Sequence, residues 1–243
     1  MRVAVLNDVH GNLPALEAVL AEVPGDALLV FGGDIVSGPM PRETMQRVEA
    51  LGPRARCLRG NADVPAEDVG GELAKRRRRF VFSQLSRHQR ELLEALPPTL
   101  KIEVDGLGPT LFCHGSPRDE NEILTIVSAE ARLRSILSGV EEHLVVCGHT
   151  HHQFDRTAGR HRLVNAGSVG MPYEGRRGAY WALLGPEVEF RRTEYELEAA
   201  SEAIRASGYP EPDEDLLPNL LDPPSADTVA EVFERQALAT VAS

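Results

Sequence analysis

The sequence has few cysteines and no long apolar run, and both shortages exclude classes of protein. Its three cysteines, Cys57, Cys113 and Cys147, are an odd number, and each lies at the end of an apolar run. We therefore expect small buried thiols in a reducing compartment rather than a disulfide framework. Apolar runs such as residues 27–31 are far shorter than the roughly 20 residues of a transmembrane helix. The N-terminal apolar stretch, residues 3–6, is too short for a signal peptide.

Basic residues are also scarce relative to acidic ones. The chain has 26 Lys and Arg against 37 Asp and Glu, which gives a formal net charge of -11. A protein that binds nucleic acid or an anionic membrane over a broad surface normally carries a basic field. A nucleic-acid partner is therefore not favoured, no membrane partner is expected, and a small local anion site stays compatible with the charge. With 42% hydrophobic residues the chain can bury a sizeable core, and we expect a cytoplasmic globular protein.

What the sequence does contain is a repeated pattern in which a short apolar run ends abruptly in polar residues. The runs are residues 3–6, 28–31, 56–58, 110–113 and 144–147. They are followed by NDVHG, GGDIVSGP, RGNAD, HGSPRDE and GHTHH, in that order. Short runs of Val, Leu and Ile bounded by Gly are typical of strands, and the continuous apolar character predicts that both strand faces are buried.

Helix signals lie between these strands. Apolar residues recur at helical spacing over residues 13–23 after Asn12, a candidate N-cap, and residues 86–89 form a capping box. Ser128 is expected to cap a third helix over residues 131–137. Further strands are predicted within residues 162–170, 179–184 and 188–195, and the alternation of strands and helices predicts an α/β fold.

Ligand-type side chains gather where the predicted strands end. They are Asp8, His10, Asp34, Asn61, His114, His149 and His151. Histidine is not a favoured turn residue, so turn chemistry does not explain this set. The carboxyl ends of strands converge at one edge of an α/β sheet, and we expect a metal site there. The two-residue spacings of Asp8 with His10 and of His149 with His151 predict, on extended backbone, side chains that point the same way.

The ordered blocks DxH, GD, GNxD, HG and GHTH resemble those of the calcineurin-like metallophosphoesterases, and especially their small bacterial phosphodiesterase branch. The resemblance covers residues 1–192. It implies a four-layer α/β-β-α sandwich over residues 1–192, the metallophosphoesterase domain. We expect residues 193–243 to form a helical, Pro-rich and acidic C-terminal extension that packs on or near this domain.

The resemblance also implies a dinuclear metal site. One ion would bind Asp8, His10, Asp34 and His151, and the other would bind Asp34, Asn61, His114 and His149. A hydroxide that bridges the ions would attack the phosphorus. Four imidazoles beside two carboxylates favour transition metals, with manganese first and iron, nickel, cobalt or zinc as alternatives. The charges of two divalent ions, two carboxylates and one hydroxide sum to about +1. This local charge attracts a phosphate despite the net negative charge of the chain.

One position departs from the family pattern. Phosphomonoesterases of this family have a histidine between the Asn and the acidic residue of GNxD, where this chain has Ala62. That histidine is thought to stabilise the transition state or protonate the leaving oxygen, and Ala62 does neither. The departure favours the phosphodiesterase branch over drift at a loop position, and Asp63 loses its usual role of orienting that histidine.

Other residues carry weaker hypotheses. Arg118 is a candidate for binding the substrate phosphate or a plain surface charge, and Ser168, in a loop similar to the family's NPGSVG, is a second candidate substrate contact beside Asn61. His152 is expected to be structural or to support the ligands from outside. The basic run at residues 75–79 is either a solvated face or a local clamp for phosphates.

The function expected from these residues is metal-dependent hydrolysis of phosphodiesters, with a small phosphate ester or a nucleotide as substrate. The first alternative is a phosphomonoesterase or phosphoanhydride hydrolase with the same metals. The second is a non-catalytic scaffold of the same fold, which the complete ligand set disfavours. A structural zinc protein would need closely spaced cysteines, and none of the three is so placed. The oligomeric state is left open.

Overall fold

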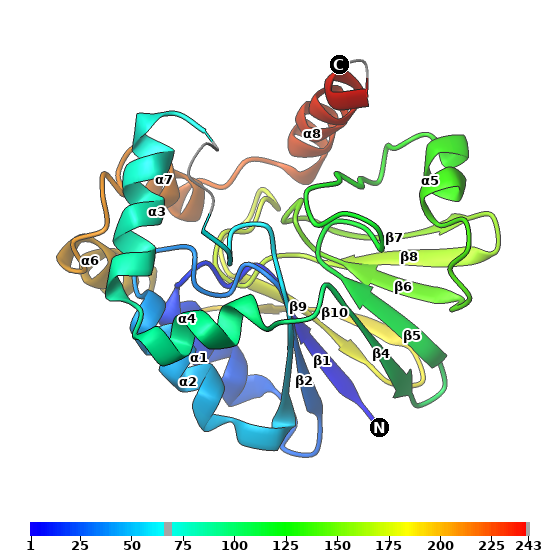
Figure 1. The fold of residues 1–243 in the computed structure, drawn as a ribbon, viewed down its shortest axis with the longest axis horizontal. Helices are drawn as coiled ribbons and strands as arrows, with labels where there is room; N and C mark the ends of the chain where they lie inside the picture. Colours follow the sequence, from blue (N-terminus) through cyan, green and yellow to red (C-terminus); the bar gives the residue numbers. More distant parts are fainter. Residues whose placement is uncertain (66–69, 242–243) are drawn as a thin grey trace.

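Two mixed β-sheets form the centre of the molecule (Figure 1). The computed structural model describes residues 1–65 and 70–241. The first sheet has the order β10 (Val188–Thr193), β9 (Ala179–Leu184), β1 (Val3–Leu6), β2 (Leu28–Gly32) and β3 (Ala55–Leu58). The second has the order β4 (Thr99–Val104), β5 (Gly108–Cys113), β6 (Leu144–Cys147), β8 (His161–Ala166) and β7 (Gln153–Ala158).

Each sheet has a parallel centre that carries the predicted ligand loops. Strands β1, β2 and β3 run parallel, with Val3 opposite Leu28, and β5, β6 and β8 run parallel in the second sheet. Strands β9, β10, β4 and β7 are attached antiparallel at the outside. The carboxyl ends of the parallel strands therefore open onto the same end of the molecule, where ligands bind in α/β folds.

The continuous apolar runs arise because both faces of the central strands are covered, as the sequence predicts. In β1, Val3 and Val5 face the second sheet and pack with residues such as Phe112, whereas Ala4 and Leu6 face the helices. Successive side chains of a strand point to opposite faces, so a strand covered on both sides must be apolar throughout. Full burial of one such side chain contributes about 1.5–3 kcal/mol.

Helices cover the outer faces and complete the predicted four layers. The apolar core outside the first sheet includes side chains from α1 (Leu13–Glu22), α2 (Pro41–Ala50), α3 (Glu72–Gln84) and α4 (Arg87–Glu94), and α5 (Glu130–Ile136) packs on the second sheet. A short 3-10 turn, Gly52–Arg54, precedes β3. Asn12 caps α1 by accepting from the Ala15 N–H at 3.2 Å, and the capping box of Ser86 and Gln89 begins α4.

The expected cap of α5 is wrong. The helix begins after Ala129 without a side-chain cap, and the Ser128 hydroxyl instead donates to Glu234 at 2.5 Å and accepts from the Thr125 N–H at 3.0 Å. The reason is tertiary: a buried carboxylate from the C-terminal helix binds the hydroxyl more strongly than a helix end can, because the carboxylate is charged.

The C-terminal segment packs on the body of the protein. Helices α6 (Leu197–Ala206) and α7 (Leu216–Leu221) share an apolar cluster that also contacts Met40 and Met171. They lie beside α3, whereas the final helix α8 (Ala226–Val241) stands at the end of the molecule onto which the ligand loops open (Figure 1). The NH group of Gly175 donates to the carbonyl of Pro224 at 2.8 Å and so ties the segment before α8 to the body.

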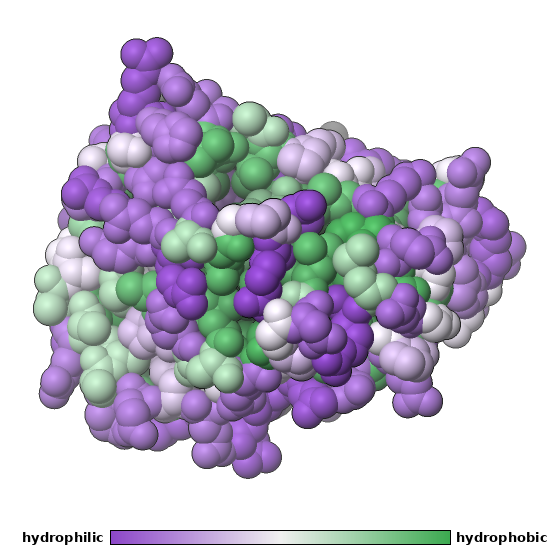
Figure 2. All heavy atoms as spheres, turned by 90° about the horizontal axis from the view of Figure 1, so that it is seen from below, coloured by the Kyte–Doolittle hydropathy of each residue, from purple (hydrophilic) through white to green (hydrophobic). Residues whose placement is uncertain are grey.

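The opposite end of the molecule presents both polar and apolar side chains. Figure 2 shows this end with polar and charged side chains around its edge and apolar side chains visible in its middle.

Among the residues that the structure describes, no helix is both long and apolar enough to span a bilayer. The cysteines Cys57, Cys113 and Cys147 are free thiols, and the last two are buried in the core under α5.

Candidate metal centre

The predicted ligand residues meet at one end of the two sheets. Asp8 and His10 follow β1, Asp34 follows β2, Asn61 follows β3, His114 follows β5, and His149 and His151 follow β6. The first sheet thus contributes three loops and the second sheet two, so the site lies where the two sheets meet. Asp8, Asp34 and His114 have at most 3% of their surface exposed, whereas Asn61 and His149 are partly exposed.

The backbone of these loops is left-handed at the ligand positions. Among the described residues, six other than glycine have positive φ, and five of them are Asp8, His10, Asp34, His149 and His151. Their φ values lie between 49° and 67°. The expectation that extended backbone aligns Asp8 with His10, and His149 with His151, is therefore wrong. Left-handed conformations cost about 1–3 kcal/mol each, and they cluster where structure is constrained for function.

Hydrogen bonds between the loops hold this conformation. The NH group of Asp8 donates to the Gly33 carbonyl at 3.1 Å, and the NH group of His10 donates to the Asp34 carbonyl at 2.9 Å. Space is also restricted, because a Cβ on Gly33 would lie 2.6 Å from His114 Nδ1. Only glycine fits between the loop after β2 and the imidazole of the second sheet.

The first cluster consists of Asp8, His10 and His151. The Nε2 atoms of the two histidines lie 3.1 Å apart, and His151 Nε2 lies 3.3 Å from Asp8 Oδ1. Each Nδ1 atom faces a backbone carbonyl, that of Ser37 for His10 at 3.0 Å and that of Met171 for His151 at 2.8 Å. Because a carbonyl accepts a hydrogen bond, we assign the proton of each neutral imidazole to its Nδ1 atom. The Nε2 lone pairs of the two rings then face each other and a carboxylate oxygen. A metal ion between these three atoms would satisfy all of them at once.

The second cluster consists of Asp8, Asp34 and His114, with Asn61 beside it. His114 Nδ1 faces the carbonyl of Gly32 at 2.8 Å, so its Nε2 atom points at Asn61 Oδ1, 2.9 Å away, and at Asp34 Oδ2, 3.5 Å away. The His149 ring lies 5.1 Å from that of His114. Asp8 Oδ1 is buried and has no hydrogen-bond partner among the described residues, as expected of a ligand atom.

Asp34 lies between the two clusters. Its Oδ2 atom is 3.8 Å from His10 Nε2 and 3.5 Å from His114 Nε2. The ligand atoms of each cluster lie within 4.8 Å of one another. The donor set of carboxylates, imidazoles and one amide oxygen fits two divalent transition-metal ions, and both clusters are consistent with a dinuclear site.

The pKa shifts of the candidate ligands indicate that positive charge is favoured between the two clusters. Burial lowers the pKa of His114, but the carboxylates of Asp34 and Asp8 outweigh it and raise the pKa to about 10. Burial would raise the pKa of Asp34, yet His114 and His10 hold it below its usual value. Burial, together with the charge of His114, lowers the pKa of His149 to about 4. The carboxylates thus bind positive charge at the centre of the site, and divalent ions are the stronger source of it.

The residues around the ligands have structural partners. Asp63 accepts from the NH groups of Ile35 at 2.9 Å and Gly60 at 3.0 Å, so it ties the loops after β2 and β3 together. Burial and the neighbouring Asp34 raise the pKa of Asp63 to about 7. The NH group of Ala62 donates to Asp34 Oδ1 at 2.8 Å, which fixes the orientation of that carboxylate.

The two candidate substrate contacts beside Asn61 are engaged within the protein. Ser168 is fully buried, and its hydroxyl donates to the carbonyl of Asp8 at 2.8 Å, which supports the loop after β1. Arg118 is exposed and forms two hydrogen bonds with Glu122, at 2.8 and 2.6 Å. His152 is buried with its Nδ1 atom 2.9 Å from the Thr150 carbonyl. None of these three joins the clusters of ligand atoms.

The basic run is an arginine-rich face of α3 that contacts the C-terminal extension. Arg77 donates to the carbonyl of Pro210 at 3.0 Å and to Asp215 at 2.6 Å, and Arg76 pairs with Glu211. Arg78 donates to the backbone carbonyl of Asn61 at 3.1 Å. Part of the run is therefore neither solvated nor a clamp for external phosphates, because acidic residues of the same chain occupy it.

Two aromatic residues beside the site were not predicted from the sequence. The Tyr173 ring stacks on that of His151, and the Phe233 ring lies 6.5 Å from that of His149. Tyr173 comes from the loop after β8 and Phe233 from α8. No motif marks either residue, and the expectation of a helical C-terminal extension does not say which surface that extension covers.

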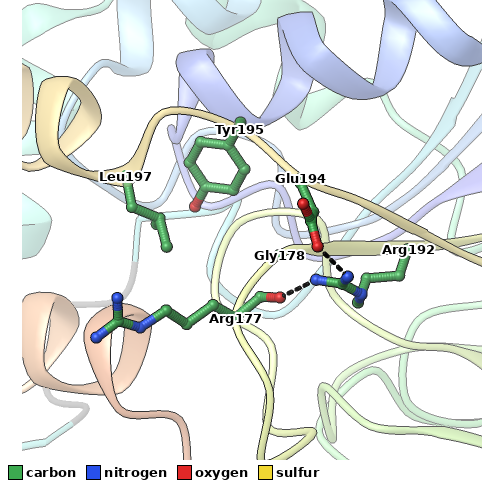
Figure 3. Close-up of a pocket in the computed structure, with 6 residues that line it drawn as sticks. All are labelled: Arg177, Gly178, Arg192, Glu194, Tyr195 and Leu197. Carbon is green, nitrogen blue, oxygen red and sulfur yellow. Dashed lines mark hydrogen bonds and ion pairs between the residues drawn. The ribbon is translucent and has the colours of Figure 1, made fainter.

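A separate cavity of about 220 Å³ lies between the β9–β10 end and α6 (Figure 3). Arg192 pairs with Glu194 and also donates to the carbonyl of Arg177 at 2.6 Å. The guanidinium of Arg177 points away from this pair and donates to the carbonyl of Leu221 at 2.5 Å. Both cations of the cavity are used within the protein, so it does not compete with the metal centre as a phosphate site.

Comparisons with known proteins agree with this geometry. Uncharacterized protein MJ0912 of Methanocaldococcus jannaschii is 25% identical over 239 residues, which cover 86% of this chain and 94% of that protein. A symmetrical bis(5'-nucleosyl)-tetraphosphatase of Yersinia enterocolitica is 27% identical over 144 residues, which cover 57% of this chain and 49% of that protein.

Two crystal structures share the fold over nearly their whole length. A metallophosphoesterase from Sphaerobacter thermophilus matches with a TM-score of 0.74 and 28% identity, covering 91% of this chain and 98% of that one. A hypothetical protein from Pyrococcus horikoshii matches with a TM-score of 0.78 and 23% identity, covering 92% and 99% of the two chains.

The sequence profile of the calcineurin-like phosphoesterase superfamily domain matches residues 1–185, which include every residue of the two clusters. The order of the ligand loops, the two-sheet architecture and this match lead to one assignment. The chain belongs to the calcineurin-like phosphoesterase superfamily.

Proposed function

We propose that the protein hydrolyses phosphodiester bonds with two divalent metal ions held by Asp8, His10, Asp34, Asn61, His114, His149 and His151. The observation that carries the proposal is the convergence of lone pairs described above. His10 Nε2 and His151 Nε2 lie 3.1 Å apart beside the buried, unpartnered Asp8 Oδ1, and a divalent cation stabilises such an arrangement. Manganese is the ion that we propose first.

When bound, two such ions supply Lewis acidity, because they lower the pKa of water and offset the charge of a phosphate. The chain orients the ligands: the carbonyls of Ser37, Met171 and Gly32 hold the Nδ1 protons and so keep each Nε2 atom directed inward. Asp8 and Asp34 reduce the positive charge of the ions without cancelling it, so a phosphate anion still binds.

Ala62 supports the diester assignment through the resemblance, because the family branch without a histidine at this position favours phosphodiesters. Its methyl group cannot donate a proton, so the chain provides no imidazole at this position to protonate a leaving oxygen. Substrates whose leaving group departs as a stable anion should therefore react fastest. Aryl esters have this property, and so do phosphoanhydrides. The similarity to a symmetrical bis(5'-nucleosyl)-tetraphosphatase supports phosphoanhydride hydrolysis as the second candidate function.

The deciding experiment measures metal content and substrate preference together. Protein reconstituted with manganese should hold about two ions per chain, by elemental analysis. It should hydrolyse aryl phosphodiesters faster than the corresponding monoesters and faster than dinucleoside polyphosphates. Faster hydrolysis of the polyphosphates would replace the first candidate by the second.

The matched variants are Asp34→Asn and Asp155→Asn. Asp34 lies between the clusters, so its amide variant should lose at least one ion. Its activity should fall by more than the roughly 10–100-fold that is lost when a residue hydrogen-bonded to a metal ligand is replaced. Asp155 pairs with Arg162 on the surface, and its amide variant should keep both ions and full activity. Wild-type protein that holds no manganese after reconstitution would refute the proposal.

A further inference from the structure

A row of aromatic rings runs from the metal centre to the C-terminal helix. The rings of His151 and Tyr173 are stacked, with centroids 5.0 Å apart and planes 22° apart. The Phe233 ring lies 6.4 Å from that of Tyr173 and 6.5 Å from that of His149. The two imidazoles belong to the proposed ligand set, so Tyr173 and Phe233 are the next side chains outward from it.

The helix that carries Phe233 is held in place. Glu234, the next residue, accepts hydrogen bonds from the hydroxyls of Ser128 at 2.5 Å and Thr125 at 3.1 Å, and it pairs with Arg132. The Glu234 side chain is only 13% exposed. These hydrogen bonds therefore fix the position of Phe233 relative to the body of the protein.

Both aromatic side chains remain partly exposed, as do His149 and Asn61. The large aromatic residues of the core differ from them, because Trp181, Phe31 and Phe112 have at most 2% of their surface exposed. Tyr173 and Phe233 thus keep part of their surface accessible and lie against the rings of two proposed ligands, His151 and His149. An accessible aromatic surface beside a charged site has the form expected for recognition of a ligand with one polar and one planar part.

We propose that Tyr173 and Phe233 form an aromatic wall that binds the planar organic group of the substrate, a nucleobase or an aryl ring, while its phosphate occupies the metal centre. This inference rests on the proposed function and names the substrate class within it. Aromatic side chains stack on any base because every base offers a π face, and such stacking is sequence-tolerant. The net charge of -11 disfavours a long polyanion, so the wall fits one nucleotide-sized group rather than a nucleic-acid strand.

Adenosine monophosphate and ribose 5-phosphate test the wall, because they share a sugar phosphate and differ by the base. Their dissociation constants are measured by titration calorimetry on the manganese-loaded protein, which gives a readout independent of turnover. We expect the wild type to bind the nucleotide about fivefold or more tightly than the sugar phosphate. Phe233→Leu, which keeps an apolar side chain but removes one of the two π faces, should lower this ratio and leave the affinity for ribose 5-phosphate unchanged.

Two further variants separate the wall from general effects on the fold. Phe190→Leu is the matched control: Phe190 is 39% exposed on edge strand β10, which carries no proposed ligand, and the variant should keep the wild-type ratio. Glu234→Ala removes the acceptor of the Ser128 and Thr125 hydroxyls, so it should lower the ratio as well. Its effect should not add to that of Phe233→Leu, because both act through the same ring.

The outcomes distinguish this inference from the function on which it rests. Equal affinities for the two probes in the metal-loaded wild type would overturn the aromatic wall and leave the hydrolase assignment intact. An unchanged ratio in Phe233→Leu would do the same. A wild type that binds neither manganese nor phosphate would overturn both.

Discussion

At the scale of the residue, Glu174 carries a carboxyl group whose protonation should control stability. Burial raises the pKa of Glu174 to about 7, while the NH group of Gln153, which donates to Glu174 Oε1, acts in the opposite direction. The folded pKa exceeds the unfolded value of 4.5. The unfolded chain therefore loses its proton first as the pH rises, so the free energy of unfolding falls between pH 4.5 and about 7.

Glu174→Gln should remove this pH dependence, because the amide keeps the Oε1 acceptor and cannot ionise. We expect its unfolding midpoint to match that of the wild type near pH 4.5 and to exceed it by a few degrees at pH 8, measured by thermal denaturation. Glu103→Gln, on an exposed position of β4, is the control. Its unfolding midpoint should change between pH 4.5 and pH 8 by as much as that of the wild type. A wild type whose stability does not fall over this range would contradict the assignment.

The convergence of the candidate ligand residues could be predicted from the sequence, but their conformation could not. Histidines directly after apolar strands have few explanations other than a site, and the order of the blocks resembles one family. Side-chain spacing, however, carries no information on φ, and the left-handed backbone of Asp8 and His149 depends on hydrogen bonds to other loops. One of these is the bond from the His149 NH group to Asp8 Oδ2 at 3.0 Å, which joins the two sheets.

At the scale of the element, the contact between α3 and the C-terminal extension depends on Arg77. This side chain is 12% exposed, donates to Asp215 and to the carbonyls of Pro210 and Glu211, and lies over the Tyr209 ring at 5.2 Å. Hydrogen bonds that involve a charged group contribute about 1.5–3 kcal/mol. An arginine that forms several of them with backbone carbonyls should stabilise the extension more than an exposed ion pair does.

Arg77→Gln should lower the free energy of unfolding by about 2 kcal/mol, because the shorter neutral side chain reaches fewer of these acceptors. Thermal unfolding measures the loss, and limited proteolysis between α6 and α7 shows where it acts. Arg79 is an exposed residue of the same helix, and Arg79→Gln should change stability by less than about 0.5 kcal/mol. Equal losses in both variants would show that the charge of the helix, rather than this contact, matters.

The elements themselves were predictable where both strand faces are buried, and two of the strands with an exposed face were missed. The continuous apolar runs of β1 and β6 stand out in the sequence. The edge strands β4 and β7 include exposed charged residues such as Glu103 and Asp155, so they contain no such run and were not predicted. Edge strands commonly carry charge because it prevents pairing with other chains.

At the scale of the whole molecule, the candidate metal centre lies between two sheets whose other contacts are mainly apolar. Asp8 and Asp34 come from the first sheet, and His114 and His149 come from the second. Ions bound by these residues would act across the sheet interface, and they would also offset the buried carboxylates of an acidic chain. The net charge of -11 describes the chain without ions and overstates the negative charge at this end of the molecule.

Removal of the ions should consequently destabilise the whole sandwich and not only the ligand loops. A ligand present at about 1,000 times its dissociation constant stabilises by about 4 kcal/mol, so chelation should lower the unfolding midpoint by about 10 °C. Hydrogen exchange should rise in β1 and β6 together, because the link between the sheets is lost. Manganese added back should restore both the unfolding midpoint and the slow hydrogen exchange. Chelation should lower the unfolding midpoint of Asp34→Asn by at most about half of the change in the wild type. Faster exchange confined to the loops would show that the apolar core alone holds the sheets together.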